Sequence, residues 1–169
     1  MKRLFFALWP DDLTRAVCAR LTQDIADAGR PVVAANLHVT VLFLGQVNSE
    51  QQQAMMVAAN RITPAAMQLC FDHLAYWKKP AIVCLRARQT DANLSVLVEQ
   101  LTLAAEQNGI AVEQRSYVPH VTLLRKATYL PPLQFEPVIW VSRSFCLVES
   151  CSTPQGVEYR VLQRWGCVN

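Results

Sequence analysis

The sequence has few charged residues and no long hydrophobic run. Asp, Glu, Lys and Arg make up only 17% of the 169 residues, whereas hydrophobic residues make up 52%. This balance excludes a disordered or linker-dominated chain, because the apolar surface is large enough to offset the entropy lost on folding. No apolar stretch approaches the ~20 residues that a membrane-spanning helix needs. The length predicts one domain covering residues 1–169, or two small lobes that share an interface.

Cysteine pairs at metal-ligand or redox spacing are also missing. The six cysteines include no C-x-x-C motif, which argues against a zinc or dithiol site. The N-terminal apolar stretch runs only from Leu4 to Trp9, and no small-residue cleavage site follows it. We therefore expect a cytoplasmic protein with free thiols and no membrane association.

Positive charge is modest. The formal net charge is +3 at pH 7, which suits a short phosphate-bearing ligand but is too small for a protein that coats a nucleic-acid duplex.

Strand and helix patterns alternate along the chain, with no linker between them. The predicted strands cover residues 2–8, 37–44, 68–76, 81–86, 110–114, 118–124, 138–148 and 157–165. The predicted helices begin near Asp11, Asn48 and Asp91 and end near Gly29, Thr63 and Asn108. The first helix carries a predicted apolar stripe of Leu13, Val17, Leu21 and Ile25. Together these elements predict an α+β protein with a mainly antiparallel sheet.

Two of the three histidines lie in the same short motif. The stretches 38–41 and 120–123 read His-Val-Thr-Val and His-Val-Thr-Leu, about half the chain apart, and both fall on predicted strands. Residues i and i+2 of a strand point to the same face, so each motif directs an imidazole and a hydroxyl to one side. An internal duplication would place the two pairs opposite each other across a groove. The third histidine, His73, has no such motif, and we expect it to be an ordinary structural histidine.

Paired imidazoles and hydroxyls suit phosphodiester chemistry. His38 and His120 can act as general base and general acid, because histidine titrates near neutral pH. The hydroxyls of Thr40 and Thr122 can donate hydrogen bonds to phosphoryl oxygens that gain charge in the transition state. No metal is needed if a histidine activates the water.

The two motifs and their flanks resemble the two-histidine phosphoesterases. Within them, the bacterial and archaeal RNA 2′,3′-cyclic phosphodiesterases, long called 2′-5′ RNA ligases, are the most similar branch. The resembling stretches span nearly the whole chain in order: 3–7, 30–31 with 36–45, 119–125 and 159–165. The resemblance implies a bilobal α+β fold with two pseudo-symmetric lobes around a central cleft. Each lobe would have an antiparallel sheet, flanking helices and one motif.

The resemblance also implies an activity. RNA 2′,3′-cyclic phosphodiester ends would be hydrolysed to 2′-phosphomonoesters, with reversible 2′-5′ ligation and without a metal or cofactor. His38 would be the proton donor and His120 the proton acceptor, with Thr40 and Thr122 holding the non-bridging oxygens. The residues themselves leave the choice of acid and base open. The expected partners are RNA 3′ ends with a cyclic phosphate, tRNA half-molecules among them, and the protein is expected to be a monomer.

The residues five positions after the histidines are Phe43 and Arg125. An odd offset points away from the histidine face of a regular strand, so either each strand ends or bulges here or these residues are structural. The resemblance implies that Arg125 lies near the bound phosphate or base, where it could grip phosphate. Phe43 either stacks on a base or packs in the core.

Other residues are assigned more ordinary roles. The remaining basic residues form no run, and we expect most on solvated surfaces and some along an RNA path: Arg30, Lys78, Lys79, Arg86, Arg88 and Lys126. We expect Phe5 and Trp9 in the core, whereas Tyr117 could line the cleft.

Two alternative functions stay open. The substrate could be a small cyclic phosphate, such as a nucleotide or an ADP-ribose derivative. Alternatively, the protein could be a non-catalytic module that binds RNA ends, although pure binding does not need two titrating groups.

Overall fold

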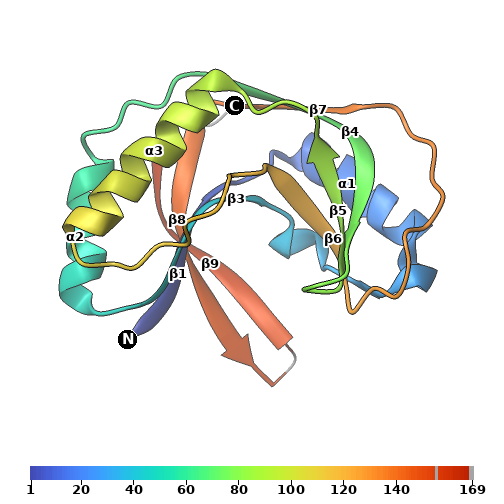
Figure 1. The fold of residues 1–169 in the computed structure, drawn as a ribbon, viewed down its shortest axis with the longest axis horizontal. Helices are drawn as coiled ribbons and strands as arrows, with labels where there is room; N and C mark the ends of the chain where they lie inside the picture. Colours follow the sequence, from blue (N-terminus) through green and yellow to red (C-terminus); the bar gives the residue numbers. More distant parts are fainter. Residues whose placement is uncertain (155, 168–169) are drawn as a thin grey trace.

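The computed structural model describes residues 1–154 and 156–167, which form a curled antiparallel sheet flanked by helices (Figure 1). The helices are α1 (Asp12–Asp24), α2 (Ser49–Ala59) and α3 (Ala92–Gln107), with short 3₁₀ turns at Ala26–Ala28 and Ala34–Asn36. The strands are β1 (Lys2–Leu8), β2 (Arg30–Pro31), β3 (Val39–Val47), β4 (Met67–Trp77), β5 (Ile82–Ala87), β6 (His120–Arg125), β7 (Val138–Ser142), β8 (Ser144–Thr153) and β9 (Gly156–Gly166). The predicted α+β fold is therefore confirmed.

The sheet consists of two halves. Its strand order is β7-β4-β5-β6-β3-β1-β8-β9, with the short β2 paired to β6. We call β3-β1-β8-β9 the first half-sheet and β7-β4-β5-β6 the second half-sheet. The halves meet where β3 pairs with β6 through Val39 and Val121. One His-Val-Thr motif therefore lies at the inner edge of each half-sheet.

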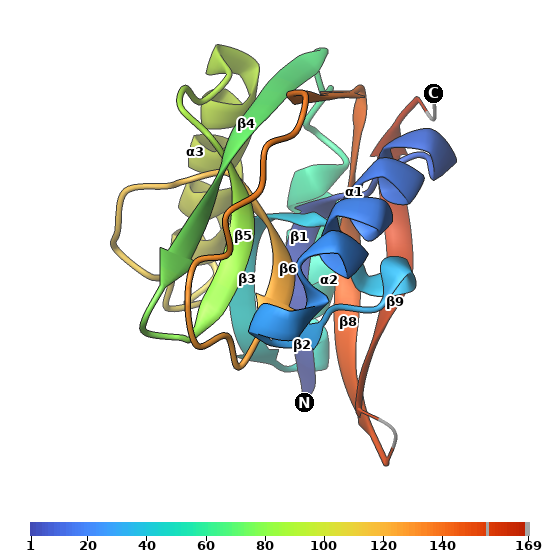
Figure 2. The same ribbon diagram turned by 90° about the vertical axis from the view of Figure 1, so that its right-hand side faces the viewer.

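The strands of the second half-sheet are consecutive in the chain and lie between those of the first. The first takes strands from both ends of the sequence, whereas the second takes them from the middle. Helix α1 lies against β6 and β7 of the second half-sheet, while α3 lies against β3 and α2 (Figures 1 and 2). The predicted single strand 138–148 was wrong, because the chain leaves the second half-sheet after β7 and enters the first at β8, with Arg143 between them.

Side-chain caps define where the helices begin. The Asp11 carboxylate accepts a hydrogen bond from the Thr14 amide, Asn48 forms a capping box with Gln51, and Asp91 caps α3. Gly109 follows α3 with φ +65°, a left-handed conformation that glycine adopts without strain. The predicted start of all three helices is thus confirmed.

The end of the first helix differs from the prediction. Helix α1 stops at Asp24, and Leu13 is 76% exposed, so the predicted apolar stripe was wrong at its first position. The backbone of Gly29 is extended rather than left-handed. A glycine fits here because another part of the backbone lies very close to its Cα. A Cβ at Gly29 would lie 2.9 Å from the Ala127 Cα and the Arg125 carbonyl oxygen, at the end of β6.

Segment 110–114, predicted as a strand, is irregular and forms part of the connection from α3 to β6. All six cysteines are free thiols, and burial raises the pKa of Cys18 to about 11 and those of Cys84 and Cys146 to about 12. Within the described residues, no helix is long and apolar enough to cross a membrane.

Candidate active site

The two motifs lie on one side of the junction between the half-sheets. The alternate residues Val39 and Val121 are fully buried in the core, as the strand pattern predicts. The four motif positions His38, Thr40, His120 and Thr122 are half-buried and line one cavity of about 230 Å³, which we call the inner cavity. The structure thus brings all four predicted residues together.

His38 is held by hydrogen bonds at both ring nitrogens. Its Nδ1 lies 2.7 Å from the Asn36 carbonyl oxygen, and its Nε2 lies 3.0 Å from the Thr40 hydroxyl. A carbonyl can only accept, so Nδ1 carries the proton, and in the neutral ring Nε2 accepts from Thr40. The proton that His38 can exchange with a ligand is therefore the one at Nε2.

Three aromatic rings surround His38. The ring centroids of Phe5, Trp9 and Tyr159 lie 5.0, 5.7 and 5.1 Å from that of the imidazole, with Trp9 stacked and Tyr159 edge-on. Phe5 is buried and Trp9 is half-buried, so the core position predicted for them also makes them walls of the His38 site. These rings shield His38 from water.

His120 is oriented in the same way as His38. Its Nδ1 lies 2.8 Å from the Val118 carbonyl oxygen, again two residues earlier in the chain. The Trp77 ring meets its imidazole edge-on, with 4.6 Å between the centroids. Both histidines therefore use Nδ1 for positioning and keep Nε2 for chemistry.

Burial favours the neutral form of both imidazoles. Loss of solvent lowers the pKa of His38 to about 4; the hydrogen bond to Asn36 acts against this shift, while the charges of His120 and Arg125 add to it. The pKa of His120 is also lowered, mainly by burial, with further contributions from Arg115, Arg125 and Arg86. An anion bound between the two rings would act in the opposite direction and raise both pKa values.

Matching bulges bring the residues five positions after the histidines into the cavity. In β3 the register against β1 shifts at Val41, and in β6 the register against β5 shifts at Leu123. Both sites are three residues after a histidine, and each shift lets the next odd position face the cavity. Phe43 and Arg125 consequently both line the inner cavity. Phe43 is 44% exposed, so the core position considered for it was wrong.

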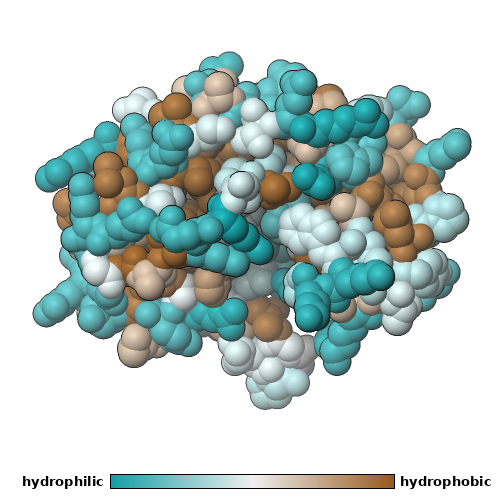
Figure 3. Space-filling model, in the orientation of Figure 1, coloured by the Kyte–Doolittle hydropathy of each residue, from teal (hydrophilic) through white to brown (hydrophobic). Residues whose placement is uncertain are grey.

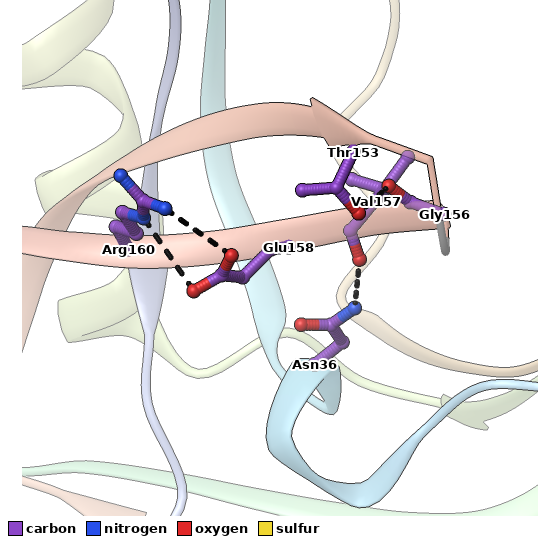
Figure 4. Close-up of polar contacts among 6 residues, drawn as sticks. All are labelled: Asn36, Thr153, Gly156, Val157, Glu158 and Arg160. Atoms are coloured by element: carbon purple, nitrogen blue, oxygen red, sulfur yellow. Dashed lines mark hydrogen bonds and ion pairs between the residues drawn. The ribbon is translucent and has the colours of Figure 1, made fainter.

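The tip of the β8–β9 hairpin supports the residue that holds His38. The Asn36 side-chain amide donates to the Val157 carbonyl oxygen of β9 at 2.7 Å (Figure 4). The Asn36 backbone carbonyl accepts from His38. Thr153 donates to the Gly156 carbonyl at 2.8 Å and closes the turn of the same hairpin. The hairpin projects beyond the body of the molecule (Figures 1 and 2).

The half-sheets are also linked by a hydrogen bond between their motif segments. Tyr117 precedes the second motif, and its hydroxyl donates to the Thr40 carbonyl oxygen of the first motif at 2.9 Å. Burial raises the pKa of this phenol. The sequence suggested that Tyr117 could line the cleft, and Tyr117 does line the larger cavity described below, where its hydroxyl connects the two motif segments.

Several cavity residues were missed from the sequence. Arg3 from β1, Trp77 from β4, Arg115 from the 110–119 segment and Tyr159 from β9 all line the inner cavity. Arg3 and Tyr159 lie inside stretches that resemble the family, which could have marked them. Trp77 and Arg115 carry no such signal, because only the fold brings their segments together.

The remaining predicted residues lie elsewhere. His73 bonds the Asp72 carboxylate at 2.7 Å, and Asp72 also pairs with Arg88 at 2.9 Å, on the surface. Arg30, Lys78 and Lys126 are exposed, whereas Arg86 is half-buried. Of these basic residues, Lys79 lines the larger cavity described below. In the described part of the chain, no group of three or more His, Cys, Asp or Glu side chains could hold a metal ion.

The geometry defines what the inner cavity can do. It places two imidazole Nε2 atoms, two threonine hydroxyls and the Arg125 guanidinium around a space that suits a phosphate group. Two separate imidazoles can donate a proton on one side of a phosphorus atom and accept one on the other.

Comparison with known proteins also indicates phosphoester chemistry. The family model described as "LigT like Phosphoesterase" matches residues 9–84. An Escherichia coli K12 protein named RNA 2′,3′-cyclic phosphodiesterase is 34% identical, and the alignment covers 97% of this chain and 96% of that protein. A Thermus thermophilus protein with the same name is 27% identical over 96% and 89%.

The fold agrees with the sequence comparison. The crystal structure of E. coli LigT in complex with 3′-AMP superposes with a TM-score of 0.89 at 32% identity, over 99% of each chain. This match includes both half-sheets and the helices that cover them. The chain therefore belongs to the LigT-like family of two-histidine phosphoesterases.

Proposed function

We propose that this protein hydrolyses the 2′,3′-cyclic phosphodiester at an RNA 3′ end and leaves a 2′-phosphomonoester. The observation that carries the proposal is the inner cavity, which both His-Val-Thr motifs line with their Nδ1 atoms already bound to the backbone. The names of the E. coli and T. thermophilus relatives support the same substrate class.

The proposed mechanism uses the two histidines on opposite sides of the phosphorus. His120 Nε2 takes a proton from water, whose oxygen forms a bond to phosphorus in line with the bond to the ribose O3′. That P–O3′ bond breaks, and His38 Nε2 gives its proton to O3′. The assignment of base and acid follows the family resemblance, because the two sites are nearly symmetric.

The other residues stabilise the charge that develops on phosphorus. The Thr40 and Thr122 hydroxyls donate to the non-bridging oxygens, and Arg125 binds the phosphate through its guanidinium. Phe43 offers an exposed ring for stacking on the base of the terminal nucleotide. His38 can carry a proton during the reaction because the bound phosphate anion offsets the effect of burial on its pKa.

Ligation is the same chemistry with another nucleophile. A ribose 5′-hydroxyl in place of water would give a 2′-5′ phosphodiester and a free 3′-hydroxyl. We infer further that residues 1–169 act as one bilobal domain, because α3 contacts β3 of the first half-sheet and β4 of the second, and the half-sheets pair with each other. The cytoplasmic location, the monomeric state and tRNA halves as substrates stay predictions.

A comparison of substrates tests the proposed function. Purified protein is incubated with an RNA oligonucleotide that ends in a 2′,3′-cyclic phosphate, with cyclic mononucleotides and with ADP-ribose 1″,2″-cyclic phosphate. We expect a higher kcat/KM on the RNA end and a 2′-phosphate as product. Faster turnover of either small cyclic phosphate would favour the first alternative, and binding without turnover would favour a non-catalytic module.

A further inference from the structure

A second, larger cavity opens beside the inner one. This outer cavity has a volume of about 630 Å³, within the usual range of about 300–1,000 Å³ for ligand pockets. It shares part of its wall with the inner cavity, namely Thr40, Phe43, Trp77, Pro80, Arg115 and His120. The face of the molecule seen in Figure 3 is hollowed near its centre, with hydrophilic side chains along the rim.

The wall of the outer cavity suits a nucleoside with a phosphate attached. Trp77 presents an aromatic ring, and Lys79 supplies positive charge. Aromatic faces combined with cations are the means by which proteins bind single-stranded nucleic acid without reading its sequence. Arg115 and Glu113, which also line the wall, form an ion pair at 3.2 Å, so their charges cancel and the net positive charge of the wall comes from Lys79.

The position of the outer cavity relative to the two histidines indicates which reactant it binds. His120 lines both cavities, whereas His38 lines the inner one and is surrounded by Phe5, Trp9 and Tyr159. In an in-line displacement the nucleophile approaches from the side of the general base, opposite the leaving oxygen. A group in the outer cavity therefore lies on the side from which the nucleophile comes, if His120 is the base.

We propose that the outer cavity binds the 5′-terminal nucleoside of a second RNA strand, whose 5′-hydroxyl attacks the cyclic phosphate in place of water. This inference rests on the proposed function and on its assignment of His120 as base. The 5′-O–P bond forms as the P–O3′ bond breaks. The 5′-hydroxyl proton passes to His120 Nε2, and a proton from His38 Nε2 passes to O3′.

Residues that line only the outer cavity can be substituted without changing the lining of the inner cavity. Lys79 lines the outer cavity, and its neighbour Lys78 is also exposed but lines neither cavity, which makes Lys79→Glu and Lys78→Glu a matched pair. On α3, Thr102 lines the outer cavity and Leu103 is 56% exposed, so Thr102→Trp and Leu103→Trp form a second pair. The exposed lysine pair reports on the cavity even if Thr102→Trp disturbs packing.

The experiment measures three activities of each variant. The first is 2′-5′ joining of an RNA with a cyclic 3′ end to an RNA with a 5′-hydroxyl, the second is hydrolysis of 2′,3′-cyclic AMP, and the third is hydrolysis of the same cyclic-ended RNA without an acceptor. For Lys79→Glu and Thr102→Trp we expect kcat/KM of joining to fall about tenfold, which corresponds to about 1.4 kcal/mol of acceptor binding. Hydrolysis of cyclic AMP and of the cyclic-ended RNA should both stay within about twofold, and both control variants should behave as wild type in all three assays.

Four other results would overturn the inference. Equal loss of joining and of cyclic AMP hydrolysis would make the outer cavity part of the cyclic-phosphate site, and no change in joining would show that the cavity does not bind the acceptor. An equal loss of joining and of cyclic-ended RNA hydrolysis, with cyclic AMP hydrolysis unchanged, would assign the cavity to the upstream part of the donor strand. If the wild-type protein hydrolyses cyclic ends but never joins RNAs, the inference fails while the proposed function stands.

Discussion

Val39 in β3 and Val121 in β6 pair with each other at the junction of the two half-sheets, each one residue after a cavity histidine. Both side chains are fully buried in the same core. The backbone at this point is therefore fixed by core packing and by the pairing of β3 with β6. The separation of His38 and His120 is therefore set by the sheet itself. A loop-borne pair would not be held in this way.

The first prediction concerns pH. Only the form with His38 protonated and His120 neutral is productive, so kcat/KM should be bell-shaped. Because burial lowers the pKa of both imidazoles in the empty enzyme, the maximum of kcat/KM should lie below pH 6.5. The maximum of kcat should lie at higher pH, since the bound phosphate anion raises both values. Initial rates from pH 4 to 9 give both profiles.

The apparent pKa values of the two limbs of the pH profile belong to the coupled histidine pair and not to His38 or His120 singly. A kcat/KM maximum above pH 7.5, or a flat profile with chemistry shown to be rate-limiting, would contradict the proposed roles of His38 and His120.

The second prediction concerns Asn36 as a positioning residue. Asn36→Ala keeps the carbonyl that accepts from His38 but removes the side-chain bond to Val157. We expect kcat to fall about fivefold, the equivalent of one ordinary hydrogen bond, with KM little changed. The kcat pH profile should shift as well, because the imidazole is held less firmly. Thr153→Ala, which removes a bond in the same hairpin away from His38, is the control. An unchanged pH profile in Asn36→Ala would leave Asn36 with a structural role only.

The third prediction concerns the close approach at Gly29. A Cβ there meets backbone atoms of Arg125 and Ala127 at 2.9 Å, and backbone cannot rotate away as a side chain can. Gly29→Ala should lower the free energy of unfolding by about 1–3 kcal/mol, as overpacking usually does, and raise KM by displacing Arg125. Urea unfolding and initial rates measure the two effects.

Gly109→Ala serves as the comparison for Gly29→Ala. A Cβ at Gly109 meets nothing within 4 Å, so only backbone strain at its φ of +65° applies, and KM should not change. Equal KM values for the two variants would refute the proposed effect on Arg125.

The fourth prediction concerns metals. The proposed mechanism takes its nucleophile activation from His120 and its charge stabilisation from Thr40, Thr122 and Arg125. Turnover should therefore persist in excess EDTA. Loss of activity on chelation, with recovery on adding back magnesium, manganese or zinc, would show that a step depends on a metal.

The comparison of sequence and structure shows what strand periodicity can and cannot reveal. It predicted that His38 and Thr40 share a face, and likewise His120 and Thr122, because that depends only on the alternation of a single strand. It could not place Phe43 and Arg125, since their orientation depends on bulges at Val41 and Leu123. A bulge depends on the register with the neighbouring strand, which the alternation of a single strand does not reveal.

The rest of the cavity depends on long-range pairing. Trp77 reaches His120 only because β5 and then β4 follow β6 in the sheet, and Tyr159 reaches His38 only because β8 and then β9 follow β1. The sequence contains these residues without any local signal of their neighbours. Similarly, segment 110–114 has the composition of a strand, but no neighbouring strand pairs with it in the structure.

The most direct measurement is the turnover of RNA with a 2′,3′-cyclic end by His38→Gln, His120→Gln and His73→Gln, with folding checked by circular dichroism. If the two cavity histidines act as acid and base, each replacement lowers kcat by about 10²-fold or more. His73→Gln, on the surface beside Asp72, is the matched control and should keep wild-type activity. A folded His38→Gln or His120→Gln protein with kcat within about twofold of wild type would contradict the two-histidine mechanism.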